Sequence, residues 1–223
     1  MTFLEYPDRD FLMLSLADRI AGQLGEVLRR GEAASLCVPG GTTPGPVFDT
    51  LSGVALDWDR VSILLTDERW VGEDDPRSNT ALVRRRLLQG QAAAARLVPM
   101  RADTPAPEDA LGALAEGVAP HLPLSVLLIG MGEDMHVASL FPGAEGLAAA
   151  LAADAPPVVA IRAPDVPEPR VTLSAPVLAG AIHVHLLILG AAKRAALERA
   201  QGLALEDAPV RAILDAATVH WAE

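Results

Sequence analysis

The sequence predicts an α/β protein built on a mainly parallel sheet with helices on both faces. Short apolar runs typical of buried strands alternate with segments of helical periodicity, which implies right-handed crossover connections. Several runs end in glycine turns that carry polar side chains, as happens at the carboxyl edge of such sheets, where ligands bind. The 223 residues show no internal repeat and no long linker, so we expect one domain over residues 1–223.

The first elements follow from apolar spacing. Leu12, Leu16 and Ile20 recur at helical intervals, which predicts a helix over residues 8–30. Residues 34–38 form an apolar run that predicts a buried strand, and its cysteine, the only one in the chain, is expected to be buried there.

The next elements are indicated by capping residues. We expect Thr43 to cap a short helix that begins at Pro44, because proline suits the first helical position. A second strand is predicted over residues 61–66, and Ser78 is expected to cap a helix that ends near residue 88.

The same criteria predict eight elements in the remainder of the chain. The helices are 108–118, 143–153 and 191–201, and the strands are 124–129, 158–161, 170–173, 182–189 and 218–221. Two proline-rich segments, 101–108 and 163–169, are expected to be loops.

Composition excludes several functional classes. With 51% hydrophobic and 21% charged residues the chain is predicted to fold around a substantial core. A net charge of −11 argues against binding to nucleic acid or to an anionic membrane. The N-terminus lacks the pattern of a signal peptide, and no apolar run approaches the ~20 residues that span a bilayer. We therefore expect a cytoplasmic protein.

Two motifs near the first two strands could bind an anion. In residues 39–44 (Pro-Gly-Gly-Thr-Thr-Pro), paired glycines let the backbone approach a ligand, and a helix N-terminus and hydroxyl groups suit phosphate. The alternative is an ordinary turn between strand and helix. Residues 66–71 (Thr-Asp-Glu-Arg-Trp-Val) place two acids beside an arginine, which is costly unless these charges are paired or used. Here the alternative is an ion pair that holds the loop.

Two further motifs follow later strands. Residues 130–142 deliver Asp134, His136 and Ser139 from a glycine turn, and histidine exchanges protons near neutral pH. Asp134 could orient His136, although a loop histidine bonded to nearby backbone is the alternative. Lys193, the one lysine among 18 basic residues, is expected in the first turn of a helix. All four motifs are predicted at the same edge of the sheet.

Other candidates receive no site assignment. His183 and His185 share one face of a strand, but no matching acid or cysteine cluster is evident, so no metal site is predicted. Residues 84–86, three arginines, are expected to be a solvated helix face. The chain has no G-x-S-x-G motif, which argues against a serine esterase.

Taken in order, the motifs resemble those of 6-phosphogluconolactonases, the lactone hydrolases of the pentose phosphate pathway. The matching segments cover about residues 36–195: Gly40-Gly41-Thr42-Thr43-Pro44, Asp67-Glu68-Arg69-Trp70-Val71 with Ser78-Asn79, Gly130 to Pro142, Arg170-Val171-Thr172-Leu173, and Gly190 with Lys193. The resemblance implies a Rossmann-like three-layer α/β/α sandwich, similar to glucosamine-6-phosphate deaminases and ribose-5-phosphate isomerases. It also implies that no metal or organic cofactor is needed.

The resemblance implies 6-phospho-D-glucono-1,5-lactone as substrate and a role for each site residue. His136 would transfer protons, assisted by Asp134 or Asp67. The substrate would be bound by residues from all the motifs: Gly40, Gly41, Thr42, Thr43, Arg69, Asn79, Ser139, Arg170 and Lys193. We expect a monomer or a small homo-oligomer.

The chain departs from the family pattern at three positions. Pro39 replaces a usual serine, Met135 a usual glycine and Val137 a usual threonine. If residue 135 needs a positive φ, methionine there is strained by about 1–3 kcal/mol.

Two alternative functions are weighed against the lactonase. A glucosamine-6-phosphate deaminase typically has Ala-Phe-Asn-Glu-Pro after its histidine and Asp-Glu-Tyr earlier, whereas this chain has Ala-Ser-Leu-Phe-Pro and Asp-Glu-Arg. A non-catalytic sugar-phosphate sensor usually carries a basic DNA-binding segment, which the sequence does not show.

Overall fold

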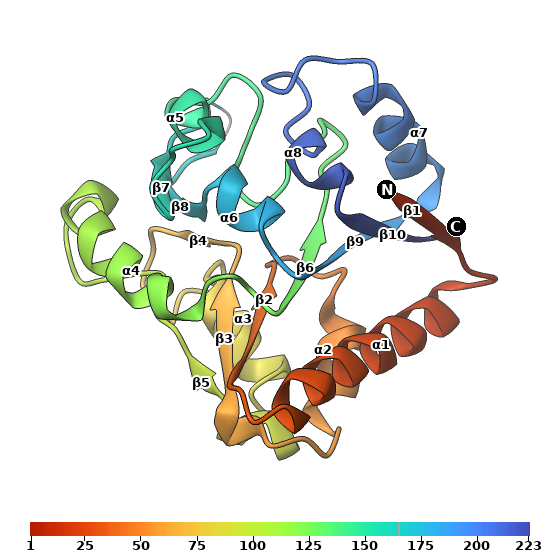
Figure 1. Cartoon of the computed structure of the whole chain (residues 1–223). Coiled ribbons are helices and arrows are strands. Elements are labelled where there is room, and N and C mark those ends of the chain that lie inside the picture. The colour runs from red at the N-terminus through yellow and green to blue at the C-terminus, as the bar shows by residue number, and fades with distance from the viewer. Residues whose placement is uncertain (165) are drawn as a thin grey trace.

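The computed structural model describes residues 1–164 and 166–223, and its central feature is a seven-stranded sheet in which every pair of neighbouring strands is parallel (Figure 1). The strand order is β1-β10-β9-β6-β2-β3-β5. The strands are β1 (Thr2–Glu5), β2 (Ala34–Val38), β3 (Val61–Leu65), β5 (Arg96–Leu97), β6 (Val126–Gly130), β9 (His183–Leu189) and β10 (Ala217–Ala222).

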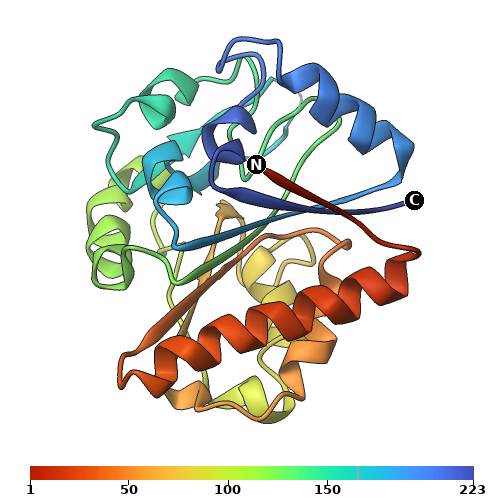
Figure 2. The same ribbon diagram turned by 45° about the vertical axis from the view of Figure 1, so that its right-hand side comes forward.

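Helices cover both faces of this sheet, so the α/β sandwich predicted from the sequence is confirmed. One face carries α1 (Arg9–Arg29), α2 (Gly45–Ser52) and α3 (Asn79–Arg86). The other carries α5 (Leu147–Leu151), α6 (Ala175–Ala179), α7 (Gly190–Ala200) and α8 (Arg211–Leu214), while α4 (Leu111–Val118) packs against β7 (Val158–Ile161). Figure 2 shows α1 and α7 on opposite sides of the strands.

The long helix α1 illustrates why the predicted elements form. Leu12, Leu16, Ile20 and Leu24 lie on one face at helical spacing and are fully buried against the sheet. The side chain of Asp8 caps the helix by accepting a hydrogen bond from the Phe11 N–H.

Strand β2 is buried on both faces, as expected for a central parallel strand. Cys37 is fully buried in it, as predicted, and burial raises the pKa of its thiol well above the usual value. A buried thiol with a raised pKa is a poor nucleophile, which agrees with a packing role.

A second, three-stranded antiparallel sheet was not predicted. It consists of β4 (Asp67–Arg69), β8 (Arg170–Leu173) and β7 (Val158–Ile161). The last two strands were predicted at the right residues but as parts of the parallel sheet. The chain leaves that sheet at Thr66, whose carbonyl accepts a hydrogen bond from the Leu173 N–H at 2.9 Å, and this tertiary contact starts the new pairing.

Several local predictions need correction. Thr43 does not cap α2: Pro44 occupies the N-cap position with a helical backbone and no side-chain hydrogen bond. Helix α5 is shorter than the predicted 143–153, and the one-turn helices α6 and α8 and the edge strands β1 and β5 were not predicted. These short elements lack a full period of apolar spacing, and tertiary packing stabilises them instead. Ser78 caps α3 as expected.

No helix in the described ranges is both long and apolar enough to cross a membrane. The described residues also contain no group of three or more metal-ligating side chains. His185 instead belongs to a buried row of hydrogen-bonded side chains that runs from Tyr6 to Gln23 on α1. The Gln23 side-chain oxygen can only accept a hydrogen bond, and this fixes the direction of the other hydrogen bonds in the row.

In this row the Tyr6 hydroxyl donates to His220 Nδ1 (2.8 Å), His220 Nε2 donates to His185 Nδ1 (3.0 Å), and His185 Nε2 donates to Gln23 Oε1 (2.7 Å). Burial lowers the pKa of His185 to about 3, with smaller effects of the neighbouring His220 and of Arg19. Burial, with a smaller effect of the Arg19 charge, lowers the pKa of His220 to about 4. Both imidazoles are therefore neutral in the folded protein at pH 5.

We predict that this pair makes the fold sensitive to acid. The two pKa values are depressed in the folded state, so between about pH 6.5 and pH 4 the unfolded chain binds protons that the folded chain does not. The free energy of unfolding should thus fall by up to about 2 kcal/mol for each histidine between pH 7 and pH 5. Urea unfolding of His185→Gln should show a weaker pH dependence. His183→Gln, at a partly exposed position of the same strand, is the control and should keep the wild-type dependence.

Candidate active site

A cavity of about 420 Å³ lies at the carboxyl edge of the parallel sheet, where the turns after β2, β3, β6 and β9 meet. All four sequence motifs contribute to it. The predicted residues that line it are Gly40, Gly41, Thr43, Asp67, Arg69, Asn79, His136, Arg170 and Lys193. The predicted convergence of the motifs is therefore confirmed.

The glycine turn after β2 forms one wall. A side chain at Gly40 would collide with the Asn79 amide, whose Nδ2 donates to the Asp67 carbonyl at 2.9 Å, and Gly41 has a φ of +82°. Thr42 is not among the described residues that line the cavity; its carbonyl accepts from the Gly45 N–H at the start of α2.

The two acids of β4 have different surroundings, because consecutive strand residues point to opposite faces. Asp67 lines the cavity, and its carboxylate accepts hydrogen bonds from Thr66 Oγ1 (2.9 Å) and Ser139 Oγ (2.6 Å). Ser139 is fully buried, so it supports Asp67 from behind and is not in the described lining, contrary to its predicted contact with substrate.

Glu68 points the other way and is 1% exposed. Its carboxylate accepts hydrogen bonds from the backbone N–H groups of Arg69 (2.8 Å), Asn79 (2.8 Å) and Thr80 (2.7 Å) and from Ser78 Oγ (3.1 Å). A carboxylate at a helix N-terminus satisfies unpaired N–H groups and interacts favourably with the helix dipole. Glu68 thus joins β4 to α3.

Two arginines face each other across the antiparallel pair of β4 and β8. Arg69 is directly opposite Arg170 in the ladder, and both line the cavity. The Nε atoms of both guanidinium groups are buried and have no hydrogen-bond partner among the described residues. Burial lowers the pKa of Arg170. Like charges at opposed positions are destabilising, so this pair indicates a site for an anion.

The loop after β6 holds the histidine. His136 Nδ1 lies 2.6 Å from Asp134 Oδ1, and this hydrogen bond lowers the pKa of the Asp134 carboxyl. A side chain at Gly132 would collide with both residues. The Phe141 ring lies 4.4 Å from the His136 ring, centroid to centroid. The histidine is thus oriented by a carboxylate, as predicted, although Asp134 itself is not among the described lining residues.

The same loop is strained at Met135. Its φ is +67°, so the left-handed conformation considered from the sequence is present, at a cost of about 1–3 kcal/mol. Its carbonyl accepts a hydrogen bond from the Val210 N–H at 3.0 Å, which helps to hold this conformation.

Lys193 lies in the first turn of α7, whose first residue, Gly190, has a φ of +78°. Its ammonium group donates to the Met131 carbonyl at 2.7 Å, so it contacts the base of the histidine loop while it lines the cavity. An ammonium group has three donors, and at most two remain for a ligand.

Sequence analysis missed the apolar side of the cavity. This side is formed by Met131, Ala138, Phe141, Val166, Leu187, Ile188 and Leu189. Most of these residues lie in or beside apolar strands, where the sequence does not distinguish a residue facing a cavity from a core residue.

A family model described as glucosamine-6-phosphate isomerases/6-phosphogluconolactonase matches residues 7–221. A 6-phosphogluconolactonase of Pseudomonas aeruginosa is 43% identical, with 92% of this chain and 88% of that protein covered. The crystal structure of a 6-phosphogluconolactonase from Shewanella baltica superposes with a TM-score of 0.95 at 34% identity, covering 100% of this chain and 98% of the other.

A more distant structure shares the fold. A monomeric glucosamine-6-phosphate deaminase has a TM-score of 0.76 at 19% identity, with 100% of this chain and 98% of that chain covered. At this identity the likeness concerns the fold alone. It agrees with the α/β/α sandwich that the sequence predicted to be shared with glucosamine-6-phosphate deaminases.

We predict that Glu68 stabilises the fold. Glu68→Ala should lower the free energy of unfolding by about 3 kcal/mol, because several buried donors lose their acceptor. The control is Glu73→Ala, since Glu73 forms an exposed ion pair with Arg84 and its loss should change stability by less than about 0.5 kcal/mol. Urea unfolding measures both variants, and equal losses would contradict the prediction.

Proposed function

This chain belongs to the glucosamine-6-phosphate isomerase/6-phosphogluconolactonase family, and we propose that it hydrolyses 6-phospho-D-glucono-1,5-lactone to 6-phospho-D-gluconate, a step of the oxidative pentose phosphate pathway. One observation carries this proposal: a histidine oriented by a carboxylate lines the same cavity as three cationic side chains. The cavity thus combines a proton-transfer group with a binding site for an anion.

The cations bind the substrate phosphate. Arg69 and Arg170 come from β4 and β8, and Lys193 comes from the first turn of α7. The Gly40-Gly41 turn lies beside them at the N-terminal end of α2. A local positive site is needed because the net charge of −11 repels an anionic substrate. Both arginines line the cavity, and a guanidinium group forms strong charge-assisted hydrogen bonds with phosphate oxygens.

His136 performs the proton transfers. Because Nδ1–H donates to Asp134, Nε2 carries the free lone pair and acts as the general base. Nε2 takes a proton from water as the water oxygen bonds to the lactone carbon, which gives a tetrahedral oxyanion. When the oxyanion collapses, the bond from this carbon to the ring oxygen breaks, and His136 returns the proton to that oxygen.

Asp134 has the better geometry for assisting His136. Its oxygen lies 2.6 Å from the ring nitrogen, whereas the Asp67 carboxylate is engaged by Thr66 and Ser139 and lies 3.9 Å from Arg170. We therefore assign orientation of the histidine to Asp134. Asp67 holds Arg170 in place and accepts a hydrogen bond from a substrate hydroxyl.

The reaction consumes only water, so the proposal includes no cofactor. A cytoplasmic location and a monomeric or small homo-oligomeric state remain predictions, which fractionation and light scattering would test.

We predict that His136→Ala reduces hydrolysis of the phosphorylated lactone to near the spontaneous rate. Removing a general base typically costs about 10²–10⁴-fold in rate. His121→Ala, outside the cavity, is the matched control and should retain wild-type activity. An unchanged rate in His136→Ala would remove this residue from the mechanism. Release of ammonia from glucosamine 6-phosphate, or phosphate-dependent binding without turnover, would instead favour the deaminase or the sensor.

We also predict that Lys193→Met raises KM for the phosphorylated lactone about tenfold or more, because a charge-assisted contact with phosphate is lost. Arg199→Met is the control on the same helix, at an exposed position outside the cavity. Steady-state kinetics measure both variants, and an unchanged KM in Lys193→Met would contradict its role in binding.

A further inference from the structure

We infer that Arg77 and Glu168 form a clasp that sets the positions of Arg69 and Arg170, so that both guanidinium groups face one phosphate. Neither residue of the clasp is among the described residues that line the cavity. They are therefore positioning residues. This inference rests on the proposed function, which assigns Arg69 and Arg170 to the phosphate.

The need for a clasp follows from the ladder. Arg69 and Arg170 are opposite each other on β4 and β8, where two positive charges repel. Arg170 is 9% exposed, so water screens little of this repulsion. Without fixed partners, the two side chains would turn away from each other while the cavity holds no anion.

Residue 77 contacts Arg69 directly and is connected to Arg170 through Glu168. Its backbone carbonyl accepts a hydrogen bond from Arg69 Nη1 at 2.7 Å. Its guanidinium group donates from Nη1 to Glu168 Oε2 at 2.9 Å, and the other carboxylate oxygen, Oε1, lies 3.4 Å from Arg170 Nη2. Arg69 is thus held directly and Arg170 through Glu168.

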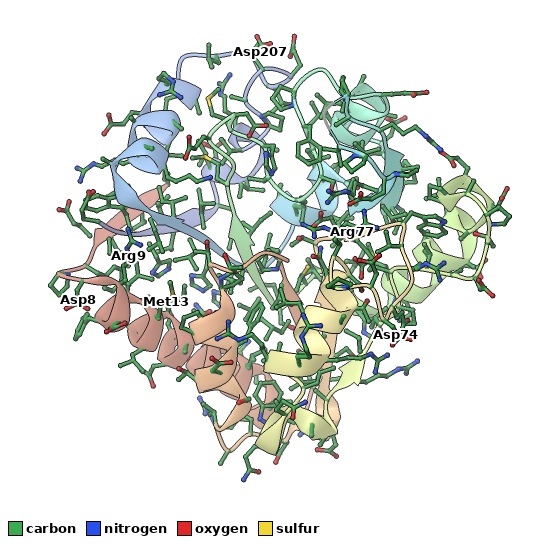
Figure 3. The ribbon with its side chains drawn as sticks, turned by 180° about the vertical axis from the view of Figure 1, so that it is seen from behind. Asp8, Arg9, Met13, Asp74, Arg77 and Asp207 are labelled. Carbon is green, nitrogen blue, oxygen red and sulfur yellow. The ribbon has the colours of Figure 1, made fainter. Side chains whose placement is uncertain are left out.

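Arg77 is itself fixed by a third group. Asp75 accepts from Arg77 Nε (3.1 Å), Nη2 (2.9 Å) and the backbone N–H (2.9 Å), which orients the side chain toward β8. Figure 3 shows Arg77 on the loop between β4 and α3, together with Asp74. The side chains of Glu168 and Arg170 are 10% and 11% exposed, so this ion pair is better shielded than a surface pair, whereas the Arg77 side chain is 50% exposed.

The clasp predicts a specific kinetic effect. Disturbing it leaves His136, Asp134 and the lactone carbon untouched, so turnover of bound substrate is unchanged. Phosphate binding weakens, because the Arg170 guanidinium group and the backbone of residue 77, which holds Arg69, must now be ordered when the substrate arrives. A role limited to folding would instead lower stability and affect every substrate equally.

The test uses Arg77→Met and Glu168→Gln in the full chain. We expect KM for 6-phosphogluconolactone to rise about tenfold in each variant, with kcat within about twofold of wild type. The double variant should be no worse than the more affected single variant, because both changes break one connection. Both substitutions at residue 77 keep the backbone carbonyl, but Arg77→Lys also keeps the positive charge beside Glu168 and should recover part of the loss. Arg84→Met is the matched control, since Arg84 forms an exposed ion pair with Glu73 on the same side of the molecule.

Two further measurements distinguish a failure of the clasp from a failure of the proposed function. Turnover of unphosphorylated glucono-1,5-lactone should be the same in wild type and variants. Calorimetric titration with inorganic phosphate should show weaker binding in Arg77→Met and Glu168→Gln, whether or not the lactone is hydrolysed. Wild-type KM and wild-type phosphate affinity in both variants would overturn the clasp. A wild-type protein that binds phosphate but does not hydrolyse the lactone would overturn the proposed function alone.

Discussion

The parallel pairing of the central strands is the constraint on which the rest of this structure depends. Because β2, β3, β6 and β9 run in the same direction, the turns that follow them meet at one edge. Parallel strands are separated by crossover connections, so residues from distant parts of the sequence come together there. One change of strand direction in this group would move a motif to the opposite edge and divide the site.

Collecting positive charge at this edge is energetically unfavourable, and the structure compensates with nearby acceptors. Arg170 has acidic neighbours in Asp67 and Glu168, while Arg69 and Lys193 donate to backbone carbonyls. These partners leave donors free toward the cavity. The strained backbone of Met135 belongs to the same arrangement, since backbone strain is often found in loops that position functional groups.

The small antiparallel sheet supplies the acidic and arginine side chains of the site. Strand β4 directs Asp67 and Arg69 to the cavity and Glu68 to the start of α3, so three consecutive residues connect the site to the helix layer. The histidine loop, after β6, adds His136 to the cavity lining and contacts β4 through the hydrogen bond from Ser139 to Asp67. A phosphorylated lactone bound in this cavity would have its phosphate near the arginines and its ester near His136. This arrangement accounts for both binding and proton transfer within one cavity.

The sequence alone determined the main elements and the location of the site. Apolar periodicity predicted α1 and the buried strands, and the residue types of the motifs indicated an anion site with a proton-transfer histidine, because these signals are local. The second sheet, the supporting role of Ser139 and the opposition of Arg69 and Arg170 were decided only by the tertiary structure. Each of these depends on a contact between segments more than 70 residues apart, for which a short window of sequence carries no signal. The different roles of Asp67 and Glu68 were also decided by the tertiary structure. The two carboxylates have the same chemistry, and only the strand, which directs them to opposite faces, places one at the cavity and the other at the start of α3.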